Sequence, residues 1–171
     1  MSSVNDAPVN TVPGARTVNE DAVLVFTGAN TISVIDVDGN LSTTQLSVSS
    51  GTLNVSLAGG ASISAGANGS STLTLSGTLA QINAALASLS YQGNADFNGG
   101  DTLTVLSTDA NGATDSDSVA ITVTSVNDGP VNTVPGAQTV NEDTSLSIGG
   151  ISVKDVDGNL ATTQLLSLIH I

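Results

Sequence analysis

The sequence predicts an all-β protein: an antiparallel β-sandwich with one short crossover helix, followed by the start of a second copy of the same module. Three observations lead to this prediction. Apolar and polar residues alternate through many short stretches, glycine-containing turns separate these stretches, and a long segment of the chain occurs twice. Short alternating strands with closely spaced turn signals are typical of β-sandwiches.

The strands are expected where the alternation is clearest. These stretches are residues 22–26, 31–35, 43–49, 52–58, 71–76, 101–108 and 118–126. Each places apolar side chains at every second position, so one face of each strand can be buried. Residues 9–15 include Pro13, which cannot donate to a ladder, and are expected to form an extended edge segment.

A helix is expected over residues 79–88, where the alternation breaks down. Leu79, Ile82, Ala85 and Leu86 share one helical face. Thr78 and Gln81 have the spacing of a capping box, which marks a helix start. We expect this helix to cross from one sheet to the other.

An internal repeat sets the domain organisation. Ser3–Asp21 returns 122 residues later, and Asp36–Leu46 returns 119 residues later. The difference of three residues should lie in a strand connection or a bulge. We therefore predict a complete module at residues 1–125, with an N-terminal linker at 3–8, and a truncated start of a second module at 126–165, which cannot close a sandwich by itself.

The last six residues, 166–171, break the repeat. Their sequence, LSLIHI, resembles the translation of an adapter used in sequencing-library preparation. We interpret them as a non-native tail. His170, the only histidine, is therefore left out of every mechanism.

The charge balance excludes several classes of partner. The chain has 15 acidic residues, two basic residues and a formal net charge of −13. It cannot neutralise phosphates, so nucleic acid and anionic membrane surfaces are not expected as partners. No apolar run approaches the roughly 20 residues of a membrane span, so membrane insertion is not expected either. Cations are the natural counterparts.

The acidic and amide side chains are expected to gather at the two ends of the module. In an immunoglobulin-like sandwich, the loop after the second strand and the loop before the last strand lie at one end, where the linker also arrives. The residues expected at this end are Asn5, Asp6, Asp36, Asp38 and Asp109. At the opposite end we expect Glu20, Asp21, Asn127 and Asp128, joined by Asp155 and Asp157 of the next module.

Calcium is the cofactor that these clusters favour. Gathered carboxylates repel one another, and two basic residues cannot relieve this repulsion. Calcium binds six to eight oxygens from carboxylates, amides and carbonyls in flexible geometry, whereas zinc prefers cysteine and histidine ligands. The competing interpretation is that DVDGN is an ordinary turn, because Asp-Gly and Asn-Gly are common turn dipeptides. The sequence excludes an EF-hand, because Leu41 occupies the position where the motif requires glycine.

The same segments resemble a known family. The order VNED, DVDGN, STDANGATDSDSVAITVTSVND is similar to that of cadherin-like repeats in giant bacterial surface adhesins, including repeats-in-toxin types. TLSGTLAQINAALASLSYQGNADFNG resembles the proteoglycan-type variant of these repeats. The resemblance implies an immunoglobulin/cadherin-like sandwich that binds calcium. The implied ligands are Glu20, Asn127, Asp128, Asp155 and Asp157 at the junction, and Asn5, Asp6, Asp36, Asp38 and Asp109 at the N-terminal end. The linker departs from the pattern, because Ser3 and Ser125 replace its first acid.

These observations lead to an expected function. The chain would be a structural repeat of a secreted or surface-exposed bacterial adhesin, with calcium at its module junctions stiffening an extended stalk for cell adhesion. Its partners would be the neighbouring modules of the same chain, and a host or neighbouring-cell surface reached through other parts of the parent. The alternative is a ligand- or glycan-binding module of such an adhesin. We do not expect an enzyme, because the chain lacks a usable nucleophile–histidine pair and a phosphate-binding loop.

Overall fold

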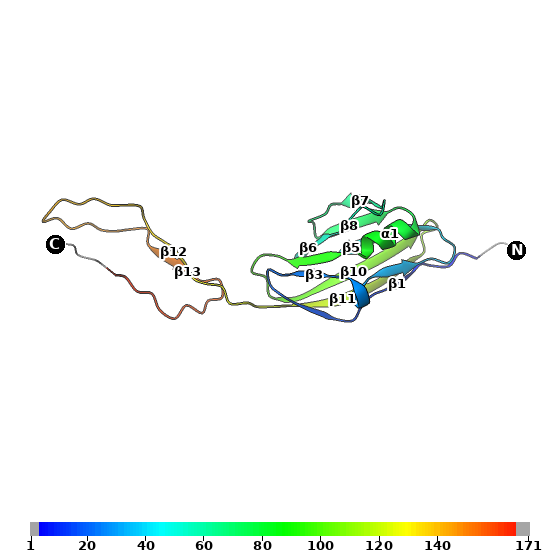
Figure 1. The fold of residues 1–171 in the computed structure, drawn as a ribbon, viewed down its shortest axis with the longest axis horizontal. Coiled ribbons are helices and arrows are strands. Elements are labelled where there is room, and N and C mark those ends of the chain that lie inside the picture. The colour runs from blue at the N-terminus through cyan, green and yellow to red at the C-terminus, as the bar shows by residue number, and fades with distance from the viewer. Residues whose placement is uncertain (1–3, 167–171) are drawn as a thin grey trace. The chain divides into compact units, whose positions relative to one another are not determined.

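The computed structural model describes residues 4–166, and its contacts divide the chain into two compact units that meet after Ser125. Of the predicted tail 166–171, only Leu166 is among the described residues. Strands dominate the first unit, and they form the all-β sandwich that the alternation predicts (Figure 1). None of the helices within residues 4–166 has the length and hydropathy needed to span a bilayer.

One layer of the first unit is a six-stranded sheet with the order β2-β11-β10-β5-β8-β7. All of its pairings are antiparallel except β2 with β11, which is parallel. Its strands are β2 (Arg16–Asn19), β5 (Leu41–Ser47), β7 (Ser62–Gly66), β8 (Thr72–Ser76), β10 (Gly99–Asp109) and β11 (Thr114–Thr124). The two longest, β10 and β11, form a hairpin in the sheet.

The other layer consists of two smaller sheets. One has the order β3-β9-β6 and the other pairs β1 with β4. The strands are β1 (Val9–Thr11), β3 (Val23–Val25), β4 (Ser33–Ile35), β6 (Gly51–Asn54) and β9 (Ser90–Gly93). A 3-10 helix, η1 (Gly28–Asn30), connects β3 to β4 in the segment where the first copy is three residues longer than the second.

The helix α1 (Leu79–Leu86) follows β8 of the six-stranded sheet and precedes β9 of the other layer, so the expected crossover is found. Thr78 accepts from the Gln81 N–H through its hydroxyl, and Gln81 accepts from the Thr78 N–H, which completes the predicted capping box. Ile82, Ala85 and Leu86 are buried, and α1 packs against β4, β5 and β8 (Figure 1).

The core lies between the two layers and is mostly aliphatic. Its aromatic members were expected to be core residues, and they are: Phe26 and Tyr91 are fully buried, and Phe97 packs against the core from a partly buried position. None of the three therefore offers an exposed ring for stacking on a sugar.

Several predicted element bounds were wrong. The strand expected over 52–58 ends at Asn54, because the Asn68 amide binds both main-chain polar groups of Val55 and replaces a strand partner. The expected edge segment 9–15 contains only β1, which ends before Pro13, and the chain enters β2 of the other layer after this segment, at Arg16. Three strands were missed: β2, β7 and β9.

The second unit contains one pair of strands among its described residues, β12 (Val131–Thr133) with β13 (Ser152–Lys154). Its register repeats that of β1 with β4, since Asn132 pairs with Val153 as Asn10 pairs with Val34. The two strands carry the same register in both units, although β12 and β13 are largely exposed.

Candidate metal centre at the module end

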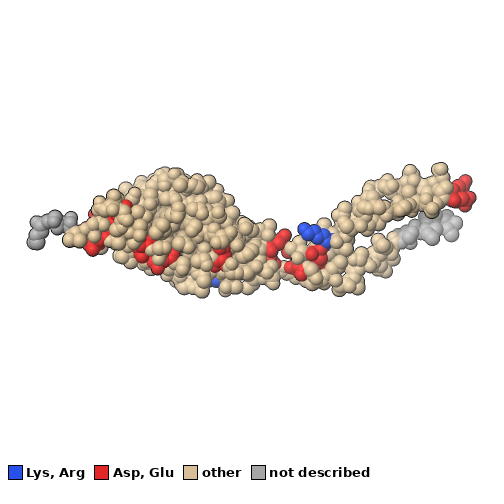
Figure 2. Space-filling view, turned by 180° about the vertical axis from the view of Figure 1, so that it is seen from behind, with Lys and Arg blue, Asp and Glu red and all other residues tan. Residues whose placement is uncertain are grey.

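Asn5 of the linker lies at the centre of a hydrogen-bonded cluster at the N-terminal end of the first unit. Its Nδ2 donates to Asp109 Oδ2 at 2.7 Å, and its Oδ1 accepts from Asn40 Nδ2 at 2.8 Å and from Asn111 Nδ2. Figure 2 shows acidic side chains, in red, gathered beside the N-terminal segment of this unit. The linker, the DVDGN turn and the β10–β11 loop therefore meet as the sequence predicts.

Asp36 and Asp38 shape the turn and hold the linker. Asp36 Oδ1 accepts from the N–H groups of Asp38 and Gly39, both at 3.0 Å, and Gly39 has a φ of 67°, which favours glycine. Asp38 Oδ2 accepts from the Asp6 N–H at 2.7 Å. The structure thus brings the main chain of Asp6 to Asp38, and the hydrogen bond does not involve the Asp6 carboxylate.

Asp109 organises the loop between β10 and β11. Its Oδ1 accepts from the N–H groups of Asn111 and Ala113, both at 2.8 Å. The hydrogen bond from Asn5, supported by these main-chain donors, holds the pKa of Asp109 below its ordinary value against the opposing effect of desolvation. The carboxylate is therefore ionised at neutral pH.

The cluster is rich in side-chain oxygens, and its amides donate to the carboxylates. With the Asn40 amide turned so that its nitrogen faces Asp36, Nδ2 donates to Asp36 Oδ2 at 3.0 Å. These residues suit calcium better than zinc, because every side-chain ligand atom is oxygen.

The second unit builds the same arrangement from its own linker and turn. The Asp157 N–H donates to Asp155 Oδ1 at 3.1 Å, and the Asp128 N–H donates to Asp157 Oδ2 at 2.6 Å. Asn159 Nδ2 donates to Asn127 Oδ1 at 2.5 Å. These three bonds are the counterparts of those made by Asp38, Asp6 and Asn40, so linker and turn form one recurring local structure.

Glu20 lies at the opposite end of the first unit, as predicted. The parallel pairing of β2 with β11 places Asn19 beside Thr124, and the Glu20 N–H donates to the Thr124 carbonyl at 2.9 Å. Glu20 is buried, and Asp21 follows it with a φ of 60° at the turn into β3. The other residues predicted for this end, Asn127 and Asp128, belong to the second unit.

Sequence reasoning missed the asparagines that complete the cluster. Asn40 and Asn111 both bind Asn5, and the recurrence of Asn40 as Asn159 in the repeat was the available signal. Asp115 Oδ2 accepts from the main-chain N–H of the buried Asn10 at 2.7 Å, so this carboxylate anchors β1.

The buried carboxylate of Asp101 was also missed. It accepts from the N–H groups of Ser49, Ser50 and Thr102 at 2.8–2.9 Å and from the Tyr91 hydroxyl at 3.0 Å. Desolvation raises its pKa, but these hydrogen bonds outweigh it, and the pKa lies below its ordinary value. For Tyr91, burial and then the neighbouring carboxylate raise the pKa. This site is fully occupied by protein donors and is structural.

Comparisons with known proteins show the family of the chain. No curated protein matches the chain. A solved structure described as fibronectin(III)-like modules of Clostridium thermocellum CbhA is similar at 16% identity and a TM-score of 0.39, covering 69% of this chain and 97% of the other. A sequence model of the Protein GAMETE EXPRESSED 2 domain matches residues 25–118, more than half of the chain. The chain therefore belongs to the Protein GAMETE EXPRESSED 2 domain family.

Proposed function

We propose that this chain is a structural repeat of a secreted or surface-exposed bacterial adhesin, in which calcium at the module junctions stiffens an extended stalk. The observation that carries the proposal is the recurring anchorage of the linker on the DVDGN turn. Asp6 binds Asp38 at 2.7 Å, and Asp128 binds Asp157 at 2.6 Å. A linker fixed in the same way on successive modules is what a regular stalk needs.

Electrostatics supplies the reason for a cation. With 15 acidic and only two basic residues, the chain cannot pair most of its carboxylates with basic side chains. A divalent ion would relieve their repulsion, and binding that is coupled to ordering of the linker would stabilise the ordered form. The proposed junction ligands are Glu20, Asn127, Asp128, Asp155 and Asp157, and those at the N-terminal end are Asn5, Asp6, Asp36, Asp38 and Asp109.

The order of residues along the chain supports the proposed junction ligands. The Glu20 N–H binds the carbonyl of Thr124, and Asn127 follows Thr124 by three residues in the sequence. The linker then leads to the turn that carries Asp155 and Asp157 within the second unit.

The test is calcium binding by the full chain. Isothermal titration should give saturable heats, and thermal melting should shift upwards with calcium relative to chelator. Asp157→Asn should weaken binding at least about tenfold, since it removes one charged ligand. Asp117→Asn removes the same charge from a β11 residue outside the clusters and should change binding by less than about twofold. Identical melting curves with calcium and chelator, or equal losses in the two variants, would refute the calcium proposal.

Stalk stiffening has its own measurement. Small-angle scattering of the full chain should show a longer and narrower distribution of dimensions with calcium than with chelator. The Asp155→Asn/Asp157→Asn double variant should lose this difference while the first unit keeps its own fold, because all of that unit's described strands lie before Ser125. A calcium-dependent narrowing that survives the double variant would rule out these two ligands.

A further inference from the structure

An asparagine followed by glycine can be attacked by its own main chain. The sequence contains three such pairs: Asn68 with Gly69, Asn98 with Gly99, and Asn111 with Gly112. In the reaction the glycine nitrogen attacks the asparagine Cγ. The N–Cγ bond forms, the Cγ–Nδ2 bond breaks, and ammonia leaves with the proton of the glycine N–H. Glycine favours this step because it has no Cβ to obstruct the approach and adopts many backbone conformations.

Water completes the modification by opening the cyclic imide at either of its two carbonyls. One product is aspartate. The other is iso-aspartate, in which the main chain runs through the former side-chain carbonyl and is longer by one methylene. The structure determines which pair reacts in the folded protein, because the attack requires an amide group and a glycine N–H that are both free to move.

Asn68 is protected by its hydrogen bonds. All three asparagines are exposed, so burial does not distinguish them. Asn68 Oδ1 accepts from the Val55 N–H, and its Nδ2 donates to the Val55 carbonyl, both at 2.9 Å. The Gly69 N–H donates to the Leu53 carbonyl at 2.9 Å. The attacking group and the attacked group are therefore both held in place.

Asn111 is held less firmly. Its Nδ2 donates to Asn5 Oδ1, and the Gly112 N–H donates to the Asp109 carbonyl at 3.3 Å, which is long for a hydrogen bond of this kind. The amide becomes free when the contact with Asn5 opens. We therefore expect Asn111 to react at a rate between those of the other two asparagines.

Asn98 lies in the connection between β9 and β10 and has the freest side chain of the three. Within residues 4–166, its amide makes no hydrogen bond. Gly99 is the first residue of β10, and its pairing with Val123 is the last at that end of the β10–β11 register. The ends of strands open more readily than their middles, which releases the glycine N–H for attack.

We propose that Asn98 is a site of spontaneous deamidation in the folded protein, and that its iso-aspartyl product loosens the start of β10. The added methylene lies directly before Gly99, so Gly99 loses its register with Val123. Both products also place a new carboxylate two residues after Asp96, in a chain that is already strongly acidic. Asn98 is not among the proposed calcium ligands, so a failure of the calcium proposal leaves this site unaffected.

Peptide mass mapping of the folded full chain, incubated in mildly alkaline buffer, measures the three rates. Asn98 should react first, and Asn68 at least about tenfold more slowly, because its two side-chain hydrogen bonds must open before the attack. In urea the rates should converge, since these hydrogen bonds are lost. A folded chain in which Asn68 reacts as fast as Asn98, or in which Asn98 does not react, overturns the proposal.

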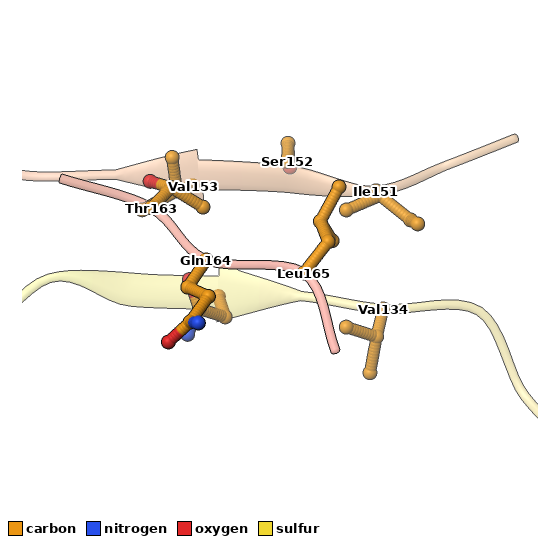
Figure 3. Close-up of a pocket in the computed structure, with 8 residues that line it drawn as sticks. Val134, Ile151, Ser152, Val153, Thr163, Gln164 and Leu165 are labelled. Atoms are coloured by element: carbon orange, nitrogen blue, oxygen red, sulfur yellow. The ribbon is translucent and has the colours of Figure 1, made fainter. Parts of the chain in front are cut away.

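Asn132 provides a control for exposure in the same maps. It lines the hollow of the second unit drawn in Figure 3, and it is exposed, but Thr133 follows it. The β-branched side chain of Thr133 crowds the attacking nitrogen, so Asn132 should remain unmodified. Reaction at Asn132 as fast as at Asn98 would show that exposure alone selects the site, and would overturn the role given to Gly99.

Two variants test the chemistry and the protection. Asn98→Gln keeps the amide but moves it one methylene further along the side chain, so the modification at this position should disappear. Asn5→Ala removes the acceptor of the Asn111 amide, and should speed the reaction at Asn111 by about threefold or more while leaving Asn98 unchanged. An unchanged rate at Asn111 would overturn the ranking by hydrogen bonds on which the choice of Asn98 rests.

Amide hydrogen exchange tests the effect on β10. The iso-aspartyl fraction, separated after incubation, should exchange faster than fresh protein at residues 99–100 and 122–123. Freshly prepared Asn98→Asp adds the charge with an ordinary main chain and should exchange like wild type. Equal exchange in the iso-aspartyl fraction and fresh protein would refute the loosening of β10, and fast exchange in Asn98→Asp would assign it to charge and not to the longer main chain.

Discussion

Replacing Asp101 with alanine should be among the most damaging single substitutions in the first unit. The carboxylate is 6% exposed and accepts four hydrogen bonds, three from main-chain N–H groups and one from the fully buried Tyr91 hydroxyl. A buried donor left without an acceptor costs about 1–3 kcal/mol. Water can reach part of the turn at Ser49 and Ser50, so the four losses do not simply add. We expect a loss of about 3–5 kcal/mol in the free energy of unfolding.

Urea denaturation of the full chain, followed by circular dichroism, measures this loss. Asp101→Asn keeps the size and one acceptor oxygen, so its stability should fall between those of wild type and Asp101→Ala. Asp117→Asn, a matched loss of one charge on β11, should change stability by less than about 0.5 kcal/mol. An Asp101→Ala protein within about 1 kcal/mol of wild type would refute the inference that this carboxylate ties the β5–β6 turn to β9 and β10.

The pH dependence gives a further check with a definite sign. The folded-state pKa of Asp101 is lowered, so the folded protein binds fewer protons at this site than the unfolded chain does. Its contribution to stability is complete above the unfolded pKa of about 3.9 and is lost as the pH falls through the folded pKa. The difference between wild type and Asp101→Asn should therefore be constant at neutral pH and shrink on acidification below about pH 4. A difference that grows on acidification would contradict the direction of the shift.

Two further substitutions test the packing by urea denaturation. Gly51→Ala would place its Cβ 2.4 Å from Tyr91 Cε2, so we expect about 2–3 kcal/mol of destabilisation, whereas Gly14→Ala, with nothing within 4 Å, should cost less than about 1 kcal/mol. Asn83→Ala would remove the amide that binds both main-chain groups of Val34, at 2.8 and 2.9 Å, and should cost about 2 kcal/mol. Asn83→Asp keeps the acceptor but sets a carboxylate oxygen against the Val34 carbonyl, so it should cost at least as much. If Gly51→Ala or Asn83→Ala were as stable as wild type, the residues around that position would adjust without cost, and the predicted destabilisation would be refuted.

The local features of the fold could be predicted from the sequence because each is specified by neighbouring residues. The α1 capping box needs only Thr78 and Gln81. The DVDGN turn needs the Asp36 carboxylate and a glycine at φ 67°. The alternation in β10 and β11 was clear because both strands lie beside others in the large sheet and bury one face.

The missed strands depend on partners that are distant in the sequence or lack an apolar pattern. β2 is a short strand with no fully buried residue, and it exists because it pairs in parallel with β11, whose Ile121 lies opposite Arg16. β7 is an edge strand of small residues, with Ile63 as its single large apolar side chain. Neither shows the buried alternation that marks a strand in a single sequence.

The buried carboxylates could have been found from the period of β10. Asp101, Leu103, Val105, Ser107 and Asp109 share the inward face of this strand, and all five are buried. An acidic side chain on the same strand face as core residues must accept hydrogen bonds from protein groups, or its burial destabilises the fold. Their position on this face therefore identifies Asp101 and Asp109 as residues that need hydrogen-bond donors. The donors themselves cannot be predicted from it, since Ser49 and Asn5 are both remote in sequence.

The repeat separates what local sequence specifies from what the completed sandwich adds. Linker and turn make the same hydrogen bonds in both units, as Asp6 with Asp38 and as Asp128 with Asp157, so these contacts need only the segments that carry them. The burial of equivalent side chains, in contrast, differs between the two units. Asn10 is 7% exposed where β10 and β11 cover it, and its counterpart Asn132 is exposed in the second unit. A site built from linker and turn can therefore form on the second unit as described, whereas the polar network around Asn10 needs a hairpin to complete it.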